Sequence, residues 1–268
     1  MKLGFIGAGN MAGAIIKGFV NKNCVNSSDI YFIRQNKEKQ AQQASELGIN
    51  GCNGYDSLIE NSDILFLGVK PVVFPTLLPQ IAKSVKKKNP LVVSMAAGLT
   101  TDSIRDMLGY NAKIIRIMPN VNAAIAMSTT AVCKNEFASD EDLATIKNLF
   151  STIGLTTEVP ENQFAIFTAI AGCSPAYVYM FIDGLARGAQ KMGMNKQKAL
   201  EIAASAVIGS ASMYAQSNEH PQELVDKVCS PGGTTIEGVT TLEEYKFTAG
   251  VVKAVENSIL KDRELSKK

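Results

Sequence analysis

Two hydrophobic patterns divide the chain near residue 158. Before that point, short apolar runs alternate with stretches whose apolar residues recur at helical spacing, which predicts buried strands separated by helices. Strands are predicted at 2–6, 30–33, 63–69, 91–94 and 113–117, edge strands at 129–133 and 156–159, and helices at 10–21 and 37–47. Because the strands are apolar throughout, we expect a parallel sheet covered by helices on both faces.

Residues 159–268 contain only helical patterns, predicted at 164–192, 196–216, 222–228 after Pro221, and 246–265. The first two of these helices are apolar nearly all round, which is typical of buried helices. A segment of about 110 residues is too short to cover both helices with its own chain. We therefore expect a second subunit to bury these two helices. A monomeric bundle packed on the first domain is the alternative.

Composition excludes several classes of protein. Of the 268 residues, 46% are apolar and 19% charged, with a net charge of +2, so neither nucleic acid nor a membrane surface is an expected partner. The five cysteines form no C-x-x-C pair, which predicts a reducing compartment without disulfides or zinc. With His220 as the only histidine, no metal site is expected. Neither a signal peptide nor a run of 18 apolar residues is present, so we expect a cytoplasmic protein.

The first predicted strand leads into a glycine-rich turn that opens the first helix. Its pattern is G-x-G-x-x-A, formed by Gly7, Gly9 and Ala12 around Asn10 and Met11. Gly7 permits a tight turn, Gly9 allows a pyrophosphate to approach the backbone, and Ala12 keeps the helix near the strand. Amides at the helix start attract phosphate. The pattern predicts a Rossmann-type dinucleotide-binding domain; a purely structural turn is the alternative.

The residue after the second strand indicates which dinucleotide binds. An acidic residue there would favour NAD by hydrogen bonding to the ribose 2′-hydroxyl, but this chain has Arg34. Its guanidinium suits a 2′-phosphate, so we predict NADPH, with NADH as a weaker alternative. Arg34 as a solvated loop residue is the competing interpretation.

Three further loops follow predicted strands, where ligands of open parallel sheets bind. They are expected to line the nicotinamide side of the cofactor through Val69, Lys70, Pro71, Ala97 and Asn120. The amide of Asn120 could reach nicotinamide or substrate. Taken singly, each loop is also compatible with a plain turn.

The most specific pattern of the second half is Cys229-Ser-Pro-Gly-Gly-Thr-Thr235. Two glycines followed by threonines at a helix start expose backbone amides, which suits a carboxylate. The hydroxyl of Thr235 could reach a second group on the same molecule. An ordinary helix cap is an equally good explanation on physical grounds alone.

Together these stretches resemble the pyrroline-5-carboxylate reductases, over essentially the whole chain. The matching motifs are Gly4-Phe-Ile-Gly-Ala-Gly-Asn-Met-Ala12, Leu67-Gly-Val-Lys-Pro71, Ser94-Met-Ala-Ala-Gly98, Arg116-Ile-Met-Pro-Asn120, Pro175-Ala-Tyr177 and Ser230-Pro-Gly-Gly-Thr-Thr235. The resemblance implies a Rossmann-type domain at 1–158 and a helical dimerisation and substrate domain at 159–268. It also implies homodimers that assemble into decamers.

Residue roles also follow from the resemblance. The substrate would be L-1-pyrroline-5-carboxylate, reduced to L-proline by NADPH. Its carboxylate would bind the amides of Gly232, Gly233 and Thr234, helped by Ser230, and Thr235 would hydrogen-bond the ring nitrogen as the catalytic hydroxyl. Because a protonated imine is already electrophilic, aligning the two carbons is the main task.

The sequence departs from the family pattern at several positions: Val121, Asn122, Met127, Ser128, Ala171, Cys173, Ser174 and Asn218. These lie outside the cofactor and carboxylate motifs and bear on substrate packing and rate. One alternative is a β-hydroxyacid dehydrogenase, whose chemistry requires a lysine on the long interdomain helix, but residues 164–187 contain none. A non-catalytic nucleotide-sensing module is the other alternative.

Overall fold

The computed structural model of the chain describes residues 1–265. They separate into two compact units, Met1–Gly172 with the stretch that begins at Ile259, and Cys173–Ser258. The first unit thus extends past residue 158, and the domain boundary predicted there stays a prediction.

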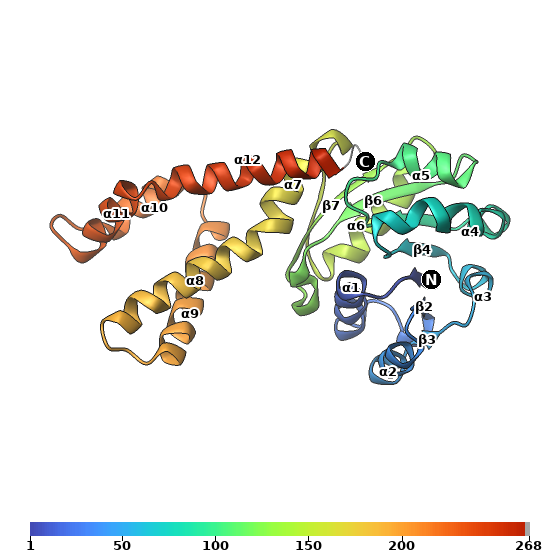
Figure 1. Cartoon of the computed structure of the whole chain (residues 1–268), viewed down its shortest axis with the longest axis horizontal. Helices are drawn as coiled ribbons and strands as arrows, with labels where there is room; N and C mark the ends of the chain where they lie inside the picture. The colour runs from blue at the N-terminus through green and yellow to red at the C-terminus, as the bar shows by residue number, and fades with distance from the viewer. Residues whose placement is uncertain (266–268) are drawn as a thin grey trace. The chain divides into compact units, whose positions relative to one another are not determined.

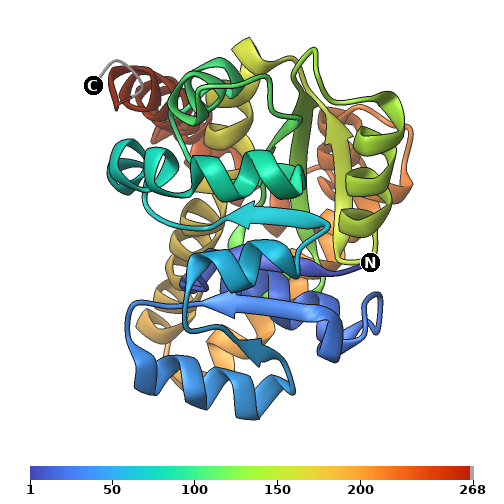
Figure 2. The same cartoon turned by 90° about the vertical axis from the view of Figure 1, so that its right-hand side faces the viewer.

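The first unit is built on one eight-stranded sheet in the order β3-β2-β1-β4-β5-β6-β7-β8 (Figure 2). The strands are β1 (Leu3–Ile6), β2 (Ile30–Ile33), β3 (Asn50–Gly51), β4 (Ile64–Leu67), β5 (Leu91–Ser94), β6 (Ile114–Met118), β7 (Ser128–Lys134) and β8 (Gly154–Glu158). The first six are parallel, in the order of dinucleotide-binding folds. The neighbours β1 and β4 connect in opposite directions, so a crevice opens at their carboxyl ends.

Alternate residues of the central strands β1 and β4 enter opposite cores, as the period of two requires. One core holds Phe5 and Phe66, whose rings stack at 4.5 Å, under α1 (Asn10–Asn21) and α6 (Asp140–Ser151). The other core holds Ile6 and Leu67 under α3 (Tyr55–Glu60), α4 (Phe74–Lys88) and α5 (Thr101–Leu108). The prediction of a sheet covered on both faces is therefore confirmed.

The expected edge strand at 129–133 is an interior strand instead. It is part of β7, which pairs antiparallel with β6 and parallel with β8, so of the two expected edge strands only β8 lies at an edge of the sheet. Direction reverses because β6 connects to β7 through only the short helix η3 (Val121–Ile125), without a crossover helix. Apolar composition predicted the strand but carried no information on its neighbours.

The second unit is helical, as expected. It contains α8 (Ser174–Lys191), α9 (Lys196–Gln216), α10 (Pro221–Val228), α11 (Thr234–Glu244) and the part of α12 (Phe247–Leu265) up to Ser258 (Figure 1). Within it, α8 contacts α12 through a 2.7 Å hydrogen bond between the hydroxyls of Tyr177 and Ser258 and through the rings of Phe181 and Phe247. The helix predicted from residue 164 begins as α7 (Phe164–Phe167) and widens to a π-helix at Thr168–Cys173 before α8.

Much apolar surface of the second unit is exposed. Met180, Met213 and Tyr245 are 75%, 67% and 82% accessible. The helical stretch Glu161–Lys191 is also long and apolar enough to cross a membrane, since it contains an 18-residue window with a mean hydropathy of 1.6, of which 11% is buried. The absence of long apolar runs therefore did not exclude a spanning helix, and the expected absence of a membrane partner stays a prediction.

Candidate active site

The glycine turn begins where β1 ends. Gly7 has φ +89°, a conformation that side chains disfavour, and Gly9 caps α1, which starts at Asn10. The first turn of α1 contains no acidic residue, so its amides and the positive end of its dipole face outward unopposed. A Cβ on Gly9 would meet no protein atom within 4 Å. The space beside Gly9 is therefore not filled by other protein atoms, and a ligand can occupy it.

The turns after β1 and β4 are in direct contact at the crevice. A Cβ on Gly68 would lie 2.4 Å from the carbonyl oxygen of Gly7 and 2.8 Å from the Cβ of Ala12. A Cβ on Gly7 would lie 2.8 Å from Cγ1 of Val69. Ala12 thus has the role expected of the last position of the glycine pattern, close packing of helix and strand.

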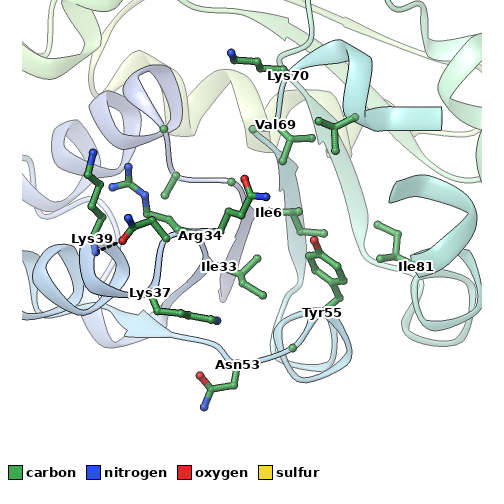
Figure 3. Close-up of a pocket in the computed structure, with 18 of the residues that line it drawn as sticks. Ile6, Ile33, Arg34, Lys37, Lys39, Asn53, Tyr55, Val69, Lys70 and Ile81 are labelled. Carbon is green, nitrogen blue, oxygen red and sulfur yellow. Dashed lines mark hydrogen bonds between the residues drawn. The ribbon is translucent and has the colours of Figure 1, made fainter. Parts of the chain in front are cut away.

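A pocket opens at this point and is rich in cationic side chains (Figure 3). Its lining comprises Ile6–Gly9, Ile33–Lys37, Lys39, Asn53–Asp56, Gly68–Lys70, Val73, Gln80 and Ile81. Figure 3 shows Arg34, Lys37 and Lys39 near the end of β2, and Lys70 at the opposite end. The lining thus contains four cationic side chains and one carboxylate, that of Asp56. This excess of positive charge suits an anionic ligand.

Arg34 is held in this pocket by α2 (Lys37–Leu47). Its backbone N–H donates to Oε1 of Gln40 at 2.8 Å, and its guanidinium Nη1 donates to Oε1 of Gln43 at 2.8 Å. The buried Gln40 in turn donates to the carbonyl of Cys52 at 2.9 Å. Within residues 1–265, no carboxylate forms an ion pair with Arg34, so its charge is not neutralised by the protein.

The structure brings many of the predicted cofactor residues together. Gly7, Gly9, Arg34, Val69 and Lys70 line the pocket, with Asn10, Met11 and Ala12 in the first turn of α1 beside it. Pro71 opens the short helix η2 (Pro71–Val73) directly after Lys70, and Ala97 is exposed in the loop after β5. Outside the prediction were Lys37, Lys39, Asn53 and Tyr55. No strand was predicted at Asn50–Gly51, so the sequence pattern did not show that residues 53–55 follow a strand beside β2.

Asn120 is engaged elsewhere. It is 4% exposed, its Nδ2 donates to the carbonyl of Ala171 at 3.0 Å, and its Oδ1 accepts from the N–H of Thr129 at 3.3 Å. Ala171 lies in the π-helical segment, and Asn120 therefore joins that segment to the start of β7. Its expected contact with nicotinamide or substrate stays a prediction.

An ionic cluster around the buried Arg116 lies on β6 near this point. Arg116 donates to Glu161 at 3.2 Å, and Glu161 also accepts from the N–H and hydroxyl of Thr101 at 2.8 and 3.0 Å. Burial, followed by the charge of Glu161, raises the pKa of the neighbouring Cys133 thiol to about 12. Cys133 is therefore a protonated, unreactive thiol near neutral pH.

The turn before α11 has the geometry of a type II β-turn. Pro231 occupies its second position, Gly232 has φ +66°, and the N–H of Gly233 donates to the carbonyl of Ser230 at 3.0 Å. The turn therefore uses the Gly233 amide in this structure, and its expected contact with a carboxylate stays a prediction. The amides of the first turn of α11, from Thr234 onward, have no intrahelical acceptor and stay available, and Thr235 is exposed beside them.

A glycine turn, an unopposed arginine and a cationic pocket at the switch point of this sheet define a dinucleotide-binding domain of the Rossmann type. Residues 2–98 match the family described as NADP oxidoreductase, coenzyme F420-dependent, and residues 161–265 match pyrroline-5-carboxylate reductase dimerisation. The chain is 40% identical over 266 residues to the pyrroline-5-carboxylate reductase of Escherichia coli K12, covering 99% of this chain and 98% of the relative. It is 34% identical over 274 residues to that of Methanosarcina acetivorans, covering 100% and 98%. The chain therefore belongs to the pyrroline-5-carboxylate reductase family.

Solved structures agree with this assignment. The pyrroline carboxylate reductase of Plasmodium falciparum, crystallised with NADP bound, matches with a TM-score of 0.90 and 28% identity, over 99% of this chain and 98% of the other. The enzyme of Streptococcus pyogenes matches with a TM-score of 0.89 and 37% identity, over 98% of each chain. The fold class and family predicted from the sequence are confirmed.

Proposed function

We propose that this chain catalyses the NADPH-dependent reduction of L-1-pyrroline-5-carboxylate to L-proline, the closing step of proline synthesis. The observation that carries the proposal is the cationic glycine-turn pocket in a chain whose full length matches pyrroline-5-carboxylate reductases. Bound NADPH would supply the hydride. The protein's residues would hold the dinucleotide, bind the substrate carboxylate and orient the ring nitrogen.

On the cofactor side, the amides at the start of α1 would bind the pyrophosphate, with Gly9 leaving the space that the phosphate requires. Arg34 would bind the ribose 2′-phosphate through guanidinium N–H groups other than the one that Gln43 accepts. The loop from Val69 to Pro71, with Ala97 and Asn120, would line the nicotinamide side.

On the substrate side, the carboxylate would bind the amides of Gly232 and Thr234 and the hydroxyl of Ser230. Gly233 contributes by fixing the turn through its bond to the Ser230 carbonyl. Thr235, the second residue of α11, would hydrogen-bond the ring nitrogen. No strong acid is required, because the substrate is already electrophilic as a protonated imine, and alignment with exclusion of water supplies the rate.

For the assembly, we propose a homodimer in the cytoplasm, without a membrane partner, in which the exposed apolar surface of the second unit covers its counterpart. A family model described as dimerisation spans this unit and the end of the first. Burying large side chains such as Met180 and Tyr245 between subunits would stabilise the pair through the hydrophobic effect. Assembly of such dimers into decamers follows the family resemblance.

The test follows the absorbance of NADPH with the purified protein, as its oxidation in the presence of pyrroline-5-carboxylate and as its formation from NADP⁺ in the presence of β-hydroxyacids. We expect turnover with the imine and formation of proline. Turnover with a hydroxyacid alone would support a β-hydroxyacid dehydrogenase, and binding of NADPH without turnover would support a nucleotide-sensing module. Either result would contradict the proposed reaction.

A further inference from the structure

Two glutamines of α2 hold the same arginine by different parts. Gln40 and Gln43 are three residues apart, so their side chains lie on one face of the helix. Gln40 accepts the backbone N–H of Arg34, and Gln43 accepts guanidinium Nη1, both at 2.8 Å. The first bond holds the backbone of Arg34 at the end of β2. The second bond orients its guanidinium group.

The side chain of Gln43 is itself confined. It is half-buried, and its Nε2 lies 3.5 Å from the position that a Cβ on Gly13 would occupy in α1. Gln43 therefore lies between Arg34 and the helix that begins at the glycine turn. This position places the amide beside α1 while its Oε1 accepts from the guanidinium.

The neutrality of Gln43 matters as much as its position. Carboxylates are the usual partners of guanidinium groups, and a glutamate here would make the stronger bond. It would also cancel the positive charge on which recognition of a phosphate depends, and would repel the phosphate directly. An amide oxygen orients the guanidinium by one N–H group while leaving its charge and its other N–H groups for a ligand.

We propose that Gln43 is a positioning residue that determines the preference for NADPH over NADH. It directs Arg34 into the pocket without neutralising it. The proposal rests on the proposed function in one respect, the assignment of Arg34 to the 2′-phosphate, and it is independent of the identity of the imine.

The test measures binding of NADP⁺ and NAD⁺ by calorimetry, without imine, to the full-length protein and four variants. Gln43→Glu is expected to weaken NADP⁺ binding by about 10-fold or more while NAD⁺ binding changes by less than about 2-fold. Gln43→Met retains the length but removes the acceptor, and is expected to weaken NADP⁺ binding by about 3- to 10-fold.

The matched control is Gln42→Glu, which adds the same charge one residue away on the exposed side of α2, where Gln42 donates to Glu46 at 2.7 Å. Screening by solvent should keep both affinities within about 2-fold of the parent protein. If Gln43→Glu and Gln42→Glu behave alike, or if Gln43→Glu weakens both dinucleotides equally, Gln43 has no role in discrimination and the proposal is wrong.

The fourth variant, Arg34→Ala, tests the assignment of Arg34 to the 2′-phosphate separately from the role of Gln43. An unchanged NADP⁺/NAD⁺ ratio in Arg34→Ala overturns both the phosphate assignment and the role of Gln43. A reduced ratio in Arg34→Ala combined with an unchanged ratio in both Gln43 variants overturns only the role of Gln43. Failure to reduce the imine would refute the proposed reaction and would leave these binding ratios as they are.

Discussion

The charge of Arg34 has no acidic partner among residues 1–265, which is unusual for an arginine held in a pocket. If it binds the 2′-phosphate, Arg34→Ala should raise the KM for NADPH about 10- to 100-fold, as expected for the loss of charge-assisted hydrogen bonds. The KM for NADH should change little, since NADH lacks that phosphate. Steady-state kinetics with both cofactors measure this, and an unchanged preference would refute the assignment.

Thr235 is expected to act on the substrate alone. Thr235→Ala should lower kcat roughly 10- to 100-fold, because the ring nitrogen loses an orienting hydrogen bond. The Kd for NADPH should be unaltered, since Thr235 belongs to the substrate half of the proposed site. Thr235→Ser, which keeps the hydroxyl, should restore most of the turnover; equal loss of NADPH affinity in Thr235→Ala would contradict the role.

Site residues that belong to a recognisable motif next to a strand could be predicted from the sequence. Site residues whose role depends only on their neighbours in the folded chain could not. Gly7, Gly9 and Arg34 follow strands in a recognisable pattern, and the structure places them in one pocket. Gln43 and Lys39 lie in a polar helix whose periodicity does not show which side faces β2. Asn120 was recognisable from its place after β6, but the sequence could not show that main-chain groups already satisfy its amide.

Among the elements, the π-helical segment makes a hydrogen bond to a residue distant in sequence. A π turn alters the backbone pairing of a helix, and the carbonyl of Ala171 accepts from Asn120. Asn120→Ala would leave this carbonyl and the N–H of Thr129 without their partner. We expect the free energy of unfolding to fall by about 2–4 kcal/mol, since buried polar groups are costly to leave unpaired.

Urea denaturation measures this change. The matched control is Asn122→Ala, since the Asn122 side chain makes no hydrogen bond among residues 1–265 and lies in η3 close to Asn120. It should change stability by less than about 0.5 kcal/mol. A similar loss in the two variants would show that the segment does not depend on the Asn120 amide.

The bounds of several elements were predictable from the sequence. The expected bounds of α1, α2, α9, β2 and β5 agree with the structure. The π-helix was not predicted, because its widening leaves the helical spacing of apolar residues almost unchanged. The partners of β7 were also missed, since pairing within a sheet depends on tertiary arrangement.

For the molecule as a whole, the exposed apolar surface of the second unit implies a partner. If that partner is a second copy, Met180→Glu should weaken the dimer, because Met180 is 75% exposed in the single chain and a charge there would be buried in the pair. Sedimentation velocity should show dissociation at concentrations where the parent protein is dimeric. Gln190→Glu, an exposed polar position of the same helix, should sediment as the parent does.

The whole-chain architecture was predictable because its signals repeat along the sequence. Strand and helix alternation predicted the first unit, and whole-chain motifs predicted the family, which the comparisons confirm. The division into units was less predictable. Residues 161–172 pack with the first unit although their composition resembles the second, since the ion pair between the buried Arg116 and the half-buried Glu161 connects them to β6.

The contact between Gly7 and Gly68 has a practical consequence for engineering. Neither position has room for even one methyl group, and each is blocked by the other's loop. Laboratory evolution that randomises the crevice should recover glycine at both sites whatever cofactor is selected. Diversity aimed at switching cofactors is therefore better directed to the end of β2 and the adjoining face of α2, where side chains can vary without collision.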